Sequence, residues 1–231
     1  SFRSIRSNMQ FISKLDGKKL LAVTSTISGE GKTFVAINTA GIIAYSGKKV
    51  IILDLDMRKP KIHLGFGVEN NVGMSTLLIK TKTISECIHH SELENLDFIT
   101  SGPIPPNPSE LIINGELNNV IKKLHEIYDF VIIDNPPIGL VSDAMEVLKI
   151  ADYPIYVFKN EYSKKYFVNN LDRLMMSNGI KNLSIILNAV DSENGGYGGY
   201  GYGGAYGYGG YYEDEPDQEK SVFKNIFGRK K

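Results

Sequence analysis

The sequence TSTISGEGKT, residues 24–33, decides the fold because it joins a glycine-rich loop to a Lys-Thr pair. An apolar run typical of a strand, Lys19–Ser25, leads into it, and the pattern that follows predicts a helix over Phe34–Gly47. A glycine-rich loop between a strand and a helix is the context of a phosphate-binding loop. Gly29 and Gly31 let backbone N–H groups approach a phosphate, and the start of the helix adds partial positive charge.

The rest of the chain alternates between strand-like and helix-like segments. Apolar runs typical of buried strands are Lys49–Asp56, Leu96–Gly102, Tyr128–Pro137, Asp152–Asn160 and Leu183–Asp191. Helical patterns cover Pro108–Ile127, Ser142–Ile150 and Lys164–Ser177. Repeated alternation implies right-handed crossovers, so we predict a doubly wound α/β fold, with a mainly parallel sheet and helices on both faces. Ligands of such folds bind outside the carboxyl ends of the strands.

The first of these strand ends predicts a site for a nucleoside triphosphate. Lys32 is placed to reach the β- and γ-phosphates, and the Thr33 hydroxyl is placed to bind Mg²⁺. The loop departs from the usual G-x-x-x-x-G-K-[ST] pattern at the first glycine, where this chain has Thr26. The alternative interpretation is a glycine-rich turn that carries a Lys-Thr pair by chance.

Carboxylates follow two other predicted strands. Asp54 and Asp56 are two residues apart, and residues i and i+2 of a strand face the same side, so both can face one cation. Asp134 follows four apolar residues in FVIIDNPP, a Walker B pattern whose acid holds Mg²⁺. The alternative is that these acids are solvated turn residues. Taken with the glycine-rich loop, the three strand ends predict one magnesium–nucleotide site.

Composition excludes several classes of function. The 231 residues contain 26 Lys and Arg and 26 Asp and Glu, so no basic field favours nucleic acid as a partner. A single cysteine, Cys87, excludes an internal disulfide framework and fits a reducing compartment. No apolar run approaches the roughly 20 residues that cross a bilayer, and no signal peptide is visible. The sequence begins with Ser1 rather than Met, which leaves a longer chain open.

The segment GGYGGYGYGGAYGYGGYY, residues 195–212, carries seven of the chain's thirteen tyrosines. Glycine loses the most conformational entropy on ordering, and glycine-rich chains behave as random coils. We therefore predict a folded domain over residues 1–194 and a flexible tail over residues 195–231. The tyrosines of this tail are expected to be presented to a binding site rather than packed in a core. The alternative is a low-complexity linker.

Four motifs together resemble the bacterial tyrosine kinases of capsule and exopolysaccharide systems, which are P-loop NTPases with a ParA/MinD-like fold. The motifs are the Walker A loop at 24–33, the family's A′ motif IILDLDMR at 51–58, the Walker B motif DNPP at 134–137, and the tyrosine cluster at 197–212. The resemblance spans essentially the whole chain, although the family loop commonly has proline where Ser28 stands. It implies an ATP-dependent protein-tyrosine kinase that uses ATP and Mg²⁺ and releases ADP.

The resemblance assigns expected roles to single residues. Lys32 stabilises the β- and γ-phosphates, and Asp54 takes the proton from the attacking tyrosine hydroxyl, a poor nucleophile at neutral pH because its pKa is about 10. The expected catalytic residues are Lys32, Asp54, Asp56 and Asp134, and the expected metal ligands are Thr33, Asp56 and Asp134. The expected nucleotide-binding residues are Ser28, Gly29, Glu30, Gly31, Lys32, Thr33, Phe34 and Asn188, the last at the adenine edge.

The family also implies that the tail is the substrate. The expected acceptors are Tyr197, Tyr200, Tyr202, Tyr206, Tyr208, Tyr211 and Tyr212. Transfer is expected between molecules of a ring-shaped homo-oligomer, such as an octamer. The family's oligomerisation motif, E-x-x-R-x-x-R, is represented by Arg3 and Arg6 in a predicted helix over residues 1–16, and its Glu falls before Ser1. Each phosphate adds about −1.5 to −2 charges, so phosphorylation is expected to disassemble the ring.

The family further implies partners at a membrane. These are a membrane polysaccharide co-polymerase that supplies an activating segment, fused or separate, and a protein-tyrosine phosphatase, with the kinase at the cytoplasmic face of the bacterial inner membrane. One alternative function is a partitioning ATPase of the ParA/MinD type, which carries a signature lysine where this chain has Ile27 and lacks a tyrosine tail. Another is an adaptor that binds nucleotide without catalysis and gates a membrane partner.

Overall fold

The computed structural model describes residues 2, 7, 17–139, 143–180 and 182–190. Arg3 and Arg6 lie outside the described residues, as does the predicted helix over residues 1–16 apart from Phe2 and Ser7. The tyrosines of the tail also lie outside them.

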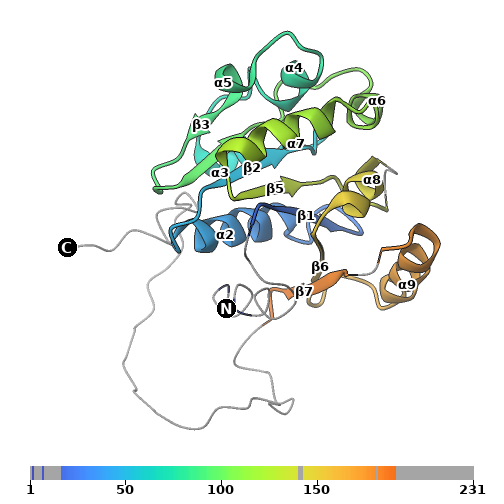
Figure 1. Ribbon diagram of the computed structural model, residues 1–231. Coiled ribbons are helices and arrows are strands. Elements are labelled where there is room, and N and C mark those ends of the chain that lie inside the picture. The colour runs from blue at the N-terminus through green and yellow to red at the C-terminus, as the bar shows by residue number, and fades with distance from the viewer. Residues whose placement is uncertain (1, 3–6, 8–16, 140–142, 181, 191–231) are drawn as a thin grey trace, which may run out of the picture.

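A seven-stranded sheet forms the centre of the described part of the chain (Figure 1). Its strands are β1 (Lys19–Ser25), β2 (Val50–Asp54), β3 (His89–His90), β4 (Leu96–Ile99), β5 (Phe130–Asp134), β6 (Tyr153–Lys159) and β7 (Ser184–Asn188). They lie in the order β3-β4-β2-β5-β1-β6-β7, and neighbours are parallel except for β3 with β4. The predicted doubly wound fold is therefore confirmed, with β3 as an unpredicted antiparallel edge.

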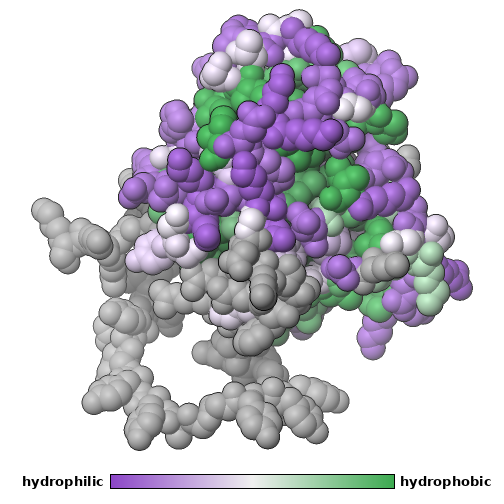
Figure 2. All heavy atoms as spheres, in the orientation of Figure 1, coloured by the Kyte–Doolittle hydropathy of each residue, from purple (hydrophilic) through white to green (hydrophobic). Residues whose placement is uncertain are grey.

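Helices cover both faces of this sheet (Figure 1). They are α2 (Lys32–Ala44), α3 (Ile62–Phe66), α4 (Met74–Leu78), α5 (Ile84–Cys87), α6 (Pro108–Ile113), α7 (Glu116–Ile127), α8 (Asp143–Ile150) and α9 (Tyr166–Asn178). Alternate strand residues point to opposite faces, so α2 packs on one face and α7 and α8 pack on the other. Figure 2 shows hydrophilic side chains over the outer surface of α7, as expected for an amphipathic helix.

Several predicted element boundaries are wrong for local reasons. The helix predicted over Pro108–Ile127 is two helices, because Gly115 adopts a left-handed φ of 85° between them. The helix predicted from Phe34 begins at Lys32 and ends at Ala44, before Gly47. Most of the predicted strands are shorter in the structure. Asp56 lies in the loop after β2, whereas Asp54 and Asp134 are the last residues of β2 and β5.

The sheet register brings the predicted strand ends together. Strand β5 lies between β2 and β1, with Asp54 paired to Asp134 and Val23 paired to the same Asp134. Parallel strands end at the same edge of a sheet, so the loop after β1 meets the carboxylates that end β2 and β5. Among the helices of the described residues, none is long and apolar enough to cross a membrane.

Candidate active site

The loop between β1 and α2 is shaped to hold an anion. Gly29 and Gly31 have left-handed φ angles of 92° and 93°. Both positions favour glycine for conformation, and a Cβ atom would also displace the Tyr162 hydroxyl, 2.9 Å away at Gly29, and Nδ2 of Asn188, 2.1 Å away at Gly31. No side chain caps the start of α2. The loop and the helix start therefore offer backbone N–H groups to a phosphate.

Lys32 forms the centre of a buried charge cluster. Its Nζ lies 2.8 Å from Oδ2 of Asp56 and 3.5 Å from Oδ1 of Asp134. The Thr33 hydroxyl donates a hydrogen bond of 2.5 Å to Oδ2 of Asp134. All three acidic residues of the two later strand ends are buried, with Asp54 beside Asp134 in the sheet register. The structure thus brings together five predicted site residues that lie up to 102 positions apart in the sequence.

Asp54 is bound on both oxygens by the backbone of the turn that follows it. Its Oδ1 accepts an N–H from Asp56 at 3.1 Å, and its Oδ2 accepts N–H groups from Lys61 at 3.2 Å and Ile62 at 3.1 Å. The side chain has no exposed surface. Asp54 therefore holds residues 55–62 in place, a role that the spacing of two acids did not predict.

Burial shifts the pKa values of the ionisable side chains in this cluster. Burial raises the pKa of Asp54 to about 8, and the charge of Asp134 acts in the same direction. Burial also raises the pKa of Asp134, although Lys32 opposes the shift. Burial by itself lowers the pKa of Lys32, but the charges of Asp134 and Asp56 outweigh it, so this pKa is raised. The cluster therefore favours bound positive charge.

We expect the metal-free protein to lose stability as the pH rises, because of Asp54. Its pKa is about 8 in the fold against 3.8 ordinarily, so between these values the folded state keeps a proton that the unfolded chain releases. The free energy of unfolding should decline from about pH 4 to about pH 8 and then level off with respect to this group. Urea denaturation in EDTA at a series of pH values measures the decline. Asp54→Asn should make it shallower, and equal slopes in the two proteins would contradict the prediction.

The residues present fit a magnesium ion. Thr33, Asp56 and Asp134 offer hydroxyl and carboxylate oxygens, the donors that Mg²⁺ prefers. The buried side chain of Asn135 has no hydrogen-bond partner for either its oxygen or its nitrogen. The described residues contain no group of three or more His, Cys, Asp and Glu side chains that could hold a metal. Mg²⁺ is usually bound by one or two carboxylates together with phosphate oxygens and waters, and Asp56 and Asp134 supply two carboxylates here.

Glu30 differs from its expected role, because its carboxylate points into the protein. It is fully buried, and its Oε2 accepts the N–H of Ile27 at 2.8 Å. Its Oε1 accepts a short hydrogen bond from the hydroxyl of Ser163, which lies in the loop between β6 and α9. The Ser163 hydroxyl in turn accepts the N–H of Lys159 at 2.8 Å. Glu30 therefore ties the phosphate loop to the next strand of the sheet and leaves only its backbone for the nucleotide.

We expect Ser163→Ala to loosen this tie. The substitution leaves the buried Glu30 carboxylate with one hydrogen bond fewer, which should lower the free energy of unfolding by about 1–3 kcal/mol and weaken ADP binding. Urea denaturation and titration with a fluorescent ADP analogue measure the two effects. The matched control is Ser177→Ala, because the Ser177 hydroxyl donates to a carbonyl of its own exposed helix. Equal effects of the two substitutions would show that the Ser163 bond is unimportant.

Three other expected or motif residues are placed by contacts within the protein. Asn188 ends β7 and donates from Nδ2 to the Glu30 carbonyl at 3.2 Å, so it packs on the phosphate loop. Phe34 is 43% exposed, and its ring lies edge-on to Phe2, with 5.7 Å between the centroids. Ser28 accepts a hydrogen bond at its carbonyl from the Tyr162 hydroxyl at 3.0 Å.

Arg58, the last residue of the A′ motif, forms a network that the sequence did not indicate. Its Nη1 lies 3.2 Å from Oδ2 of Asp143, and its Nη2 donates to the Ser109 hydroxyl at 2.7 Å. Ser109 also donates to Asp143 at 3.0 Å, and Asp143 is fully buried. The network joins the turn after β2 to α6 and α8. Its members are far apart in the sequence, so no local pattern could have revealed it.

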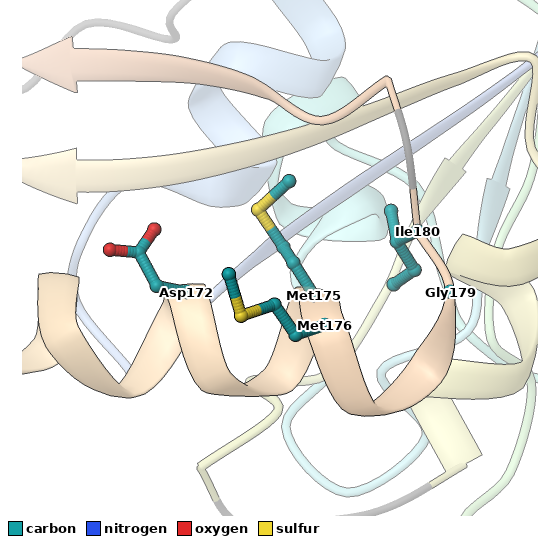
Figure 3. Close-up of a pocket in the computed structure, with 5 residues that line it drawn as sticks. All are labelled: Asp172, Met175, Met176, Gly179 and Ile180. Carbon is teal, nitrogen blue, oxygen red and sulfur yellow. The ribbon is translucent and has the colours of Figure 1, made fainter.

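A cavity of about 280 Å³ lies away from this cluster, near the carboxyl end of α9. Its lining residues are Asp172, Met175, Met176, Gly179 and Ile180 (Figure 3). Figure 3 shows the side chain of Met175 directed from the helix toward the strands above it. None of the predicted site residues that the structure describes lines this cavity.

Comparisons with known proteins agree with this geometry. The family model AAA_31, described as an AAA domain, matches residues 18–184. The tyrosine-protein kinase YwqD of Bacillus subtilis is 36% identical to this chain over 201 residues, which cover 87% of this chain and 85% of YwqD.

Two solved structures share the fold of this chain at different levels of identity. The chimerical protein CapA2B2 is 41% identical, with a TM-score of 0.75 and coverage of 80% of this chain and 82% of that one. The septum site-determining protein MinD of Pyrococcus horikoshii, complexed with Mg-ADP, is 26% identical, with a TM-score of 0.61 and coverage of 74% and 70%. The fold is thus shared with MinD, whereas the nearer likeness is to CapA2B2.

Proposed function

Since the chain belongs to the bacterial tyrosine kinase family, we propose that it transfers the γ-phosphoryl group of ATP to tyrosines of its own carboxy-terminal segment. The acceptors are Tyr197, Tyr200, Tyr202, Tyr206, Tyr208, Tyr211 and Tyr212. The observation that carries the proposal is that Lys32 lies beside the carboxylates of two other strand ends, next to a loop whose backbone conformation suits phosphate binding. The glycine-rich tail supplies many phenols on a backbone that opposes ordering.

In the proposed mechanism the loop residues bind and Lys32 neutralises charge. The backbone N–H groups of Gly29, Gly31 and the start of α2 hold the phosphates. The Lys32 ammonium, now paired with Asp56 and Asp134, faces the β- and γ-phosphates and stabilises the charge that develops during transfer. Thr33, Asp56 and Asp134 would hold Mg²⁺, which when bound supplies neutralisation of phosphate charge. Positioning and charge neutralisation account for most of the rate.

Asp54 is the proposed acceptor of the phenol proton. Its raised pKa lies closer to that of a phenol than the pKa of an ordinary aspartate does, which suits proton transfer when the group is ionised, and the charge of Lys32 favours the ionised form. Its Oδ1 accepts a single N–H, so a lone pair remains for the phenol. Because the side chain is fully buried, this role requires the turn of residues 55–62 to open as the acceptor enters.

Transfer between molecules is the proposed route, and mixing two variants tests it. Lys32→Met keeps the acceptors and removes the central cation, whereas changing all seven tail tyrosines to phenylalanine keeps the site and removes the acceptors. We expect neither variant alone to gain tail phosphate, and a mixture with ATP and Mg²⁺ to place phosphate on the Lys32→Met chain. Mass spectrometry identifies the labelled chain. If the mixture gained no tail phosphate while the wild-type protein did, transfer would take place within one molecule and the proposed route would be wrong.

A ring-shaped oligomer, such as an octamer held in part by Arg3 and Arg6, brings the tails to neighbouring sites in this proposal. Each phosphotyrosine adds about −1.5 to −2 charges, so several on one tail repel neighbouring tails and the acidic cluster. We expect incubation with ATP and Mg²⁺ to shift the protein to a smaller oligomer. Multi-angle light scattering before and after incubation measures the shift, and an unchanged mass with full phosphorylation would contradict it.

The proposed setting is the cytoplasmic face of a bacterial inner membrane, where phosphorylation regulates the polymerisation and export of a capsular or extracellular polysaccharide. A membrane co-polymerase supplies an activating segment, fused or separate, and a protein-tyrosine phosphatase resets the tail. The likeness to a chimerical protein, CapA2B2, supports a contribution from a second polypeptide. Co-purification of the chain with the cytoplasmic segment of such a co-polymerase, and faster phosphorylation in its presence, would support this partner.

A further inference from the structure

The hydroxyl of Tyr162 supports the phosphate loop from outside. It donates a hydrogen bond of 3.0 Å to the Ser28 carbonyl, and it lies 2.9 Å from the position that a Cβ would take at Gly29. Its neighbour Ser163 holds Glu30 of the same loop. Two adjacent residues of the loop between β6 and α9 therefore contact the glycine-rich turn at Ser28 and at Glu30.

Tyr162 is also open to solvent, with 46% of its surface exposed. Tyr45 and Tyr166 are more exposed, at 66% and 54%, but neither is found in a contact with the phosphate loop among the described residues. Tyr156 contacts Thr26 through its hydroxyl at 2.9 Å, but it is buried. Tyr162 thus combines an accessible phenol with direct contact to the loop.

We propose that Tyr162 is a further phosphoryl acceptor of this kinase, and that its modification releases the phosphate loop and weakens nucleotide binding. The inference rests on the proposed autophosphorylation. In the step, a new bond forms between Oη of Tyr162 and the γ-phosphorus of ATP, while the bond from that phosphorus to the bridging oxygen breaks. ADP leaves with the electron pair, and the phenol proton passes to a base or to water.

The contacts of Tyr162 explain why the modified loop would loosen. A phosphorylated Oη has no hydrogen to donate to the Ser28 carbonyl, so the modified residue loses the contact that holds it against the loop. The buried carboxylate of Glu30 in the same loop adds like-charge repulsion. Lys159, whose Nζ lies 5.1 Å from the Tyr162 ring centroid, can pair with the phosphate once the ring has swung outward.

The ring of the unmodified tyrosine lies beside Lys159, but among the described residues its hydroxyl is held by one hydrogen bond alone, to the Ser28 carbonyl. A single neutral hydrogen bond to a carbonyl favours the seated position by only about threefold to tenfold. The phenol therefore spends part of its time away from the loop, where its hydroxyl is free to attack. Phosphorylation then traps the outward position.

The test is phosphosite mapping of the full chain after incubation with ATP and Mg²⁺. We expect phosphate on Tyr162 above the level on Tyr45 and Tyr166, the exposed controls. Phosphate on the tail without phosphate on Tyr162 would overturn the inference and leave the proposed function standing. Absence of phosphate from every tyrosine would overturn both.

Nucleotide affinity supplies the second readout. A fluorescent ADP analogue should bind wild-type phosphorylated protein about tenfold more weakly than the same protein after phosphatase treatment, as expected for a lost hydrogen bond and an added like charge. Tyr162→Phe keeps the ring and loses the acceptor, so phosphatase treatment should change its affinity less. If phosphatase treatment changed the affinity of both proteins equally, the change would come from the tail phosphates and the inference would be overturned.

Discussion

Lys32→Met should lower the rate of tail phosphorylation by about 100-fold to 1,000-fold, the loss that follows removal of one preorganised group that stabilises the transition state. The Lys32 ammonium is buried and contacts Asp56 at 2.8 Å and Asp134 at 3.5 Å. Methionine has an unbranched side chain one atom shorter than that of lysine and supplies no charge, so the transferring phosphoryl group loses its protein cation. Single-turnover labelling with excess enzyme, followed by mass spectrometry of the tail, measures the rate.

The control for this substitution is Lys80→Met. Lys80 is an exposed lysine, with 71% of its side chain accessible, and its Nζ lies 2.9 Å from Glu116. An exposed ion pair contributes little, so Lys80→Met should leave the rate within about twofold of wild type. Circular dichroism establishes that both variants fold. A Lys32→Met protein that is folded and labels its tail at the wild-type rate would remove Lys32 from the mechanism.

Phenylalanine at all seven tail tyrosines should abolish phosphorylation of residues 191–231 and remove most of the phosphotyrosine that the chain acquires. The substitutions delete seven hydroxyls and change no charge, and the cluster around Lys32 is built from residues outside the tail. Binding of an ADP analogue should therefore stay at the wild-type value. Phosphopeptide mapping and nucleotide titration measure the two outcomes.

The matched control changes Tyr45 and Tyr166 to phenylalanine, since both are exposed and lie outside the tail. This double variant should keep the wild-type level of tail phosphate. If the tail variant instead retained the wild-type total of phosphotyrosine, the acceptors would lie in the folded domain, and the tail would not be the principal substrate.

Local pattern was sufficient for the fold class and for the members of the charge cluster. Short apolar runs predicted the strands, and the rule that ligands bind at the carboxyl ends of parallel strands predicted that the ends of β1, β2 and β5 would meet. Helix boundaries were less accurate. The break at Gly115 depends on a left-handed backbone that a glycine permits but does not require.

The sequence did not predict the directions in which the side chains point. Glu30 stands in the middle of the glycine-rich loop, yet its carboxylate is held by Ser163, 133 residues away. Arg58 belongs to a recognisable motif, yet its guanidinium pairs with the buried Asp143, 85 residues away. Such pairings depend on which segments the sheet order places side by side, and the spacing of residues within one segment carries no information about it.

The sequence by itself determined that this protein has a phosphate loop, two acidic strand ends and a tyrosine-rich tail, because glycine conformation, strand periodicity and backbone entropy act over a few neighbouring residues. Only the tertiary structure decided three contacts. Asp54 accepts hydrogen bonds from the turn that follows it, Asn188 packs on Gly31, and the Tyr162 hydroxyl donates to the Ser28 carbonyl. The Asn188 and Tyr162 contacts join segments far apart along the chain. Their geometry depends on which strands lie side by side in the sheet.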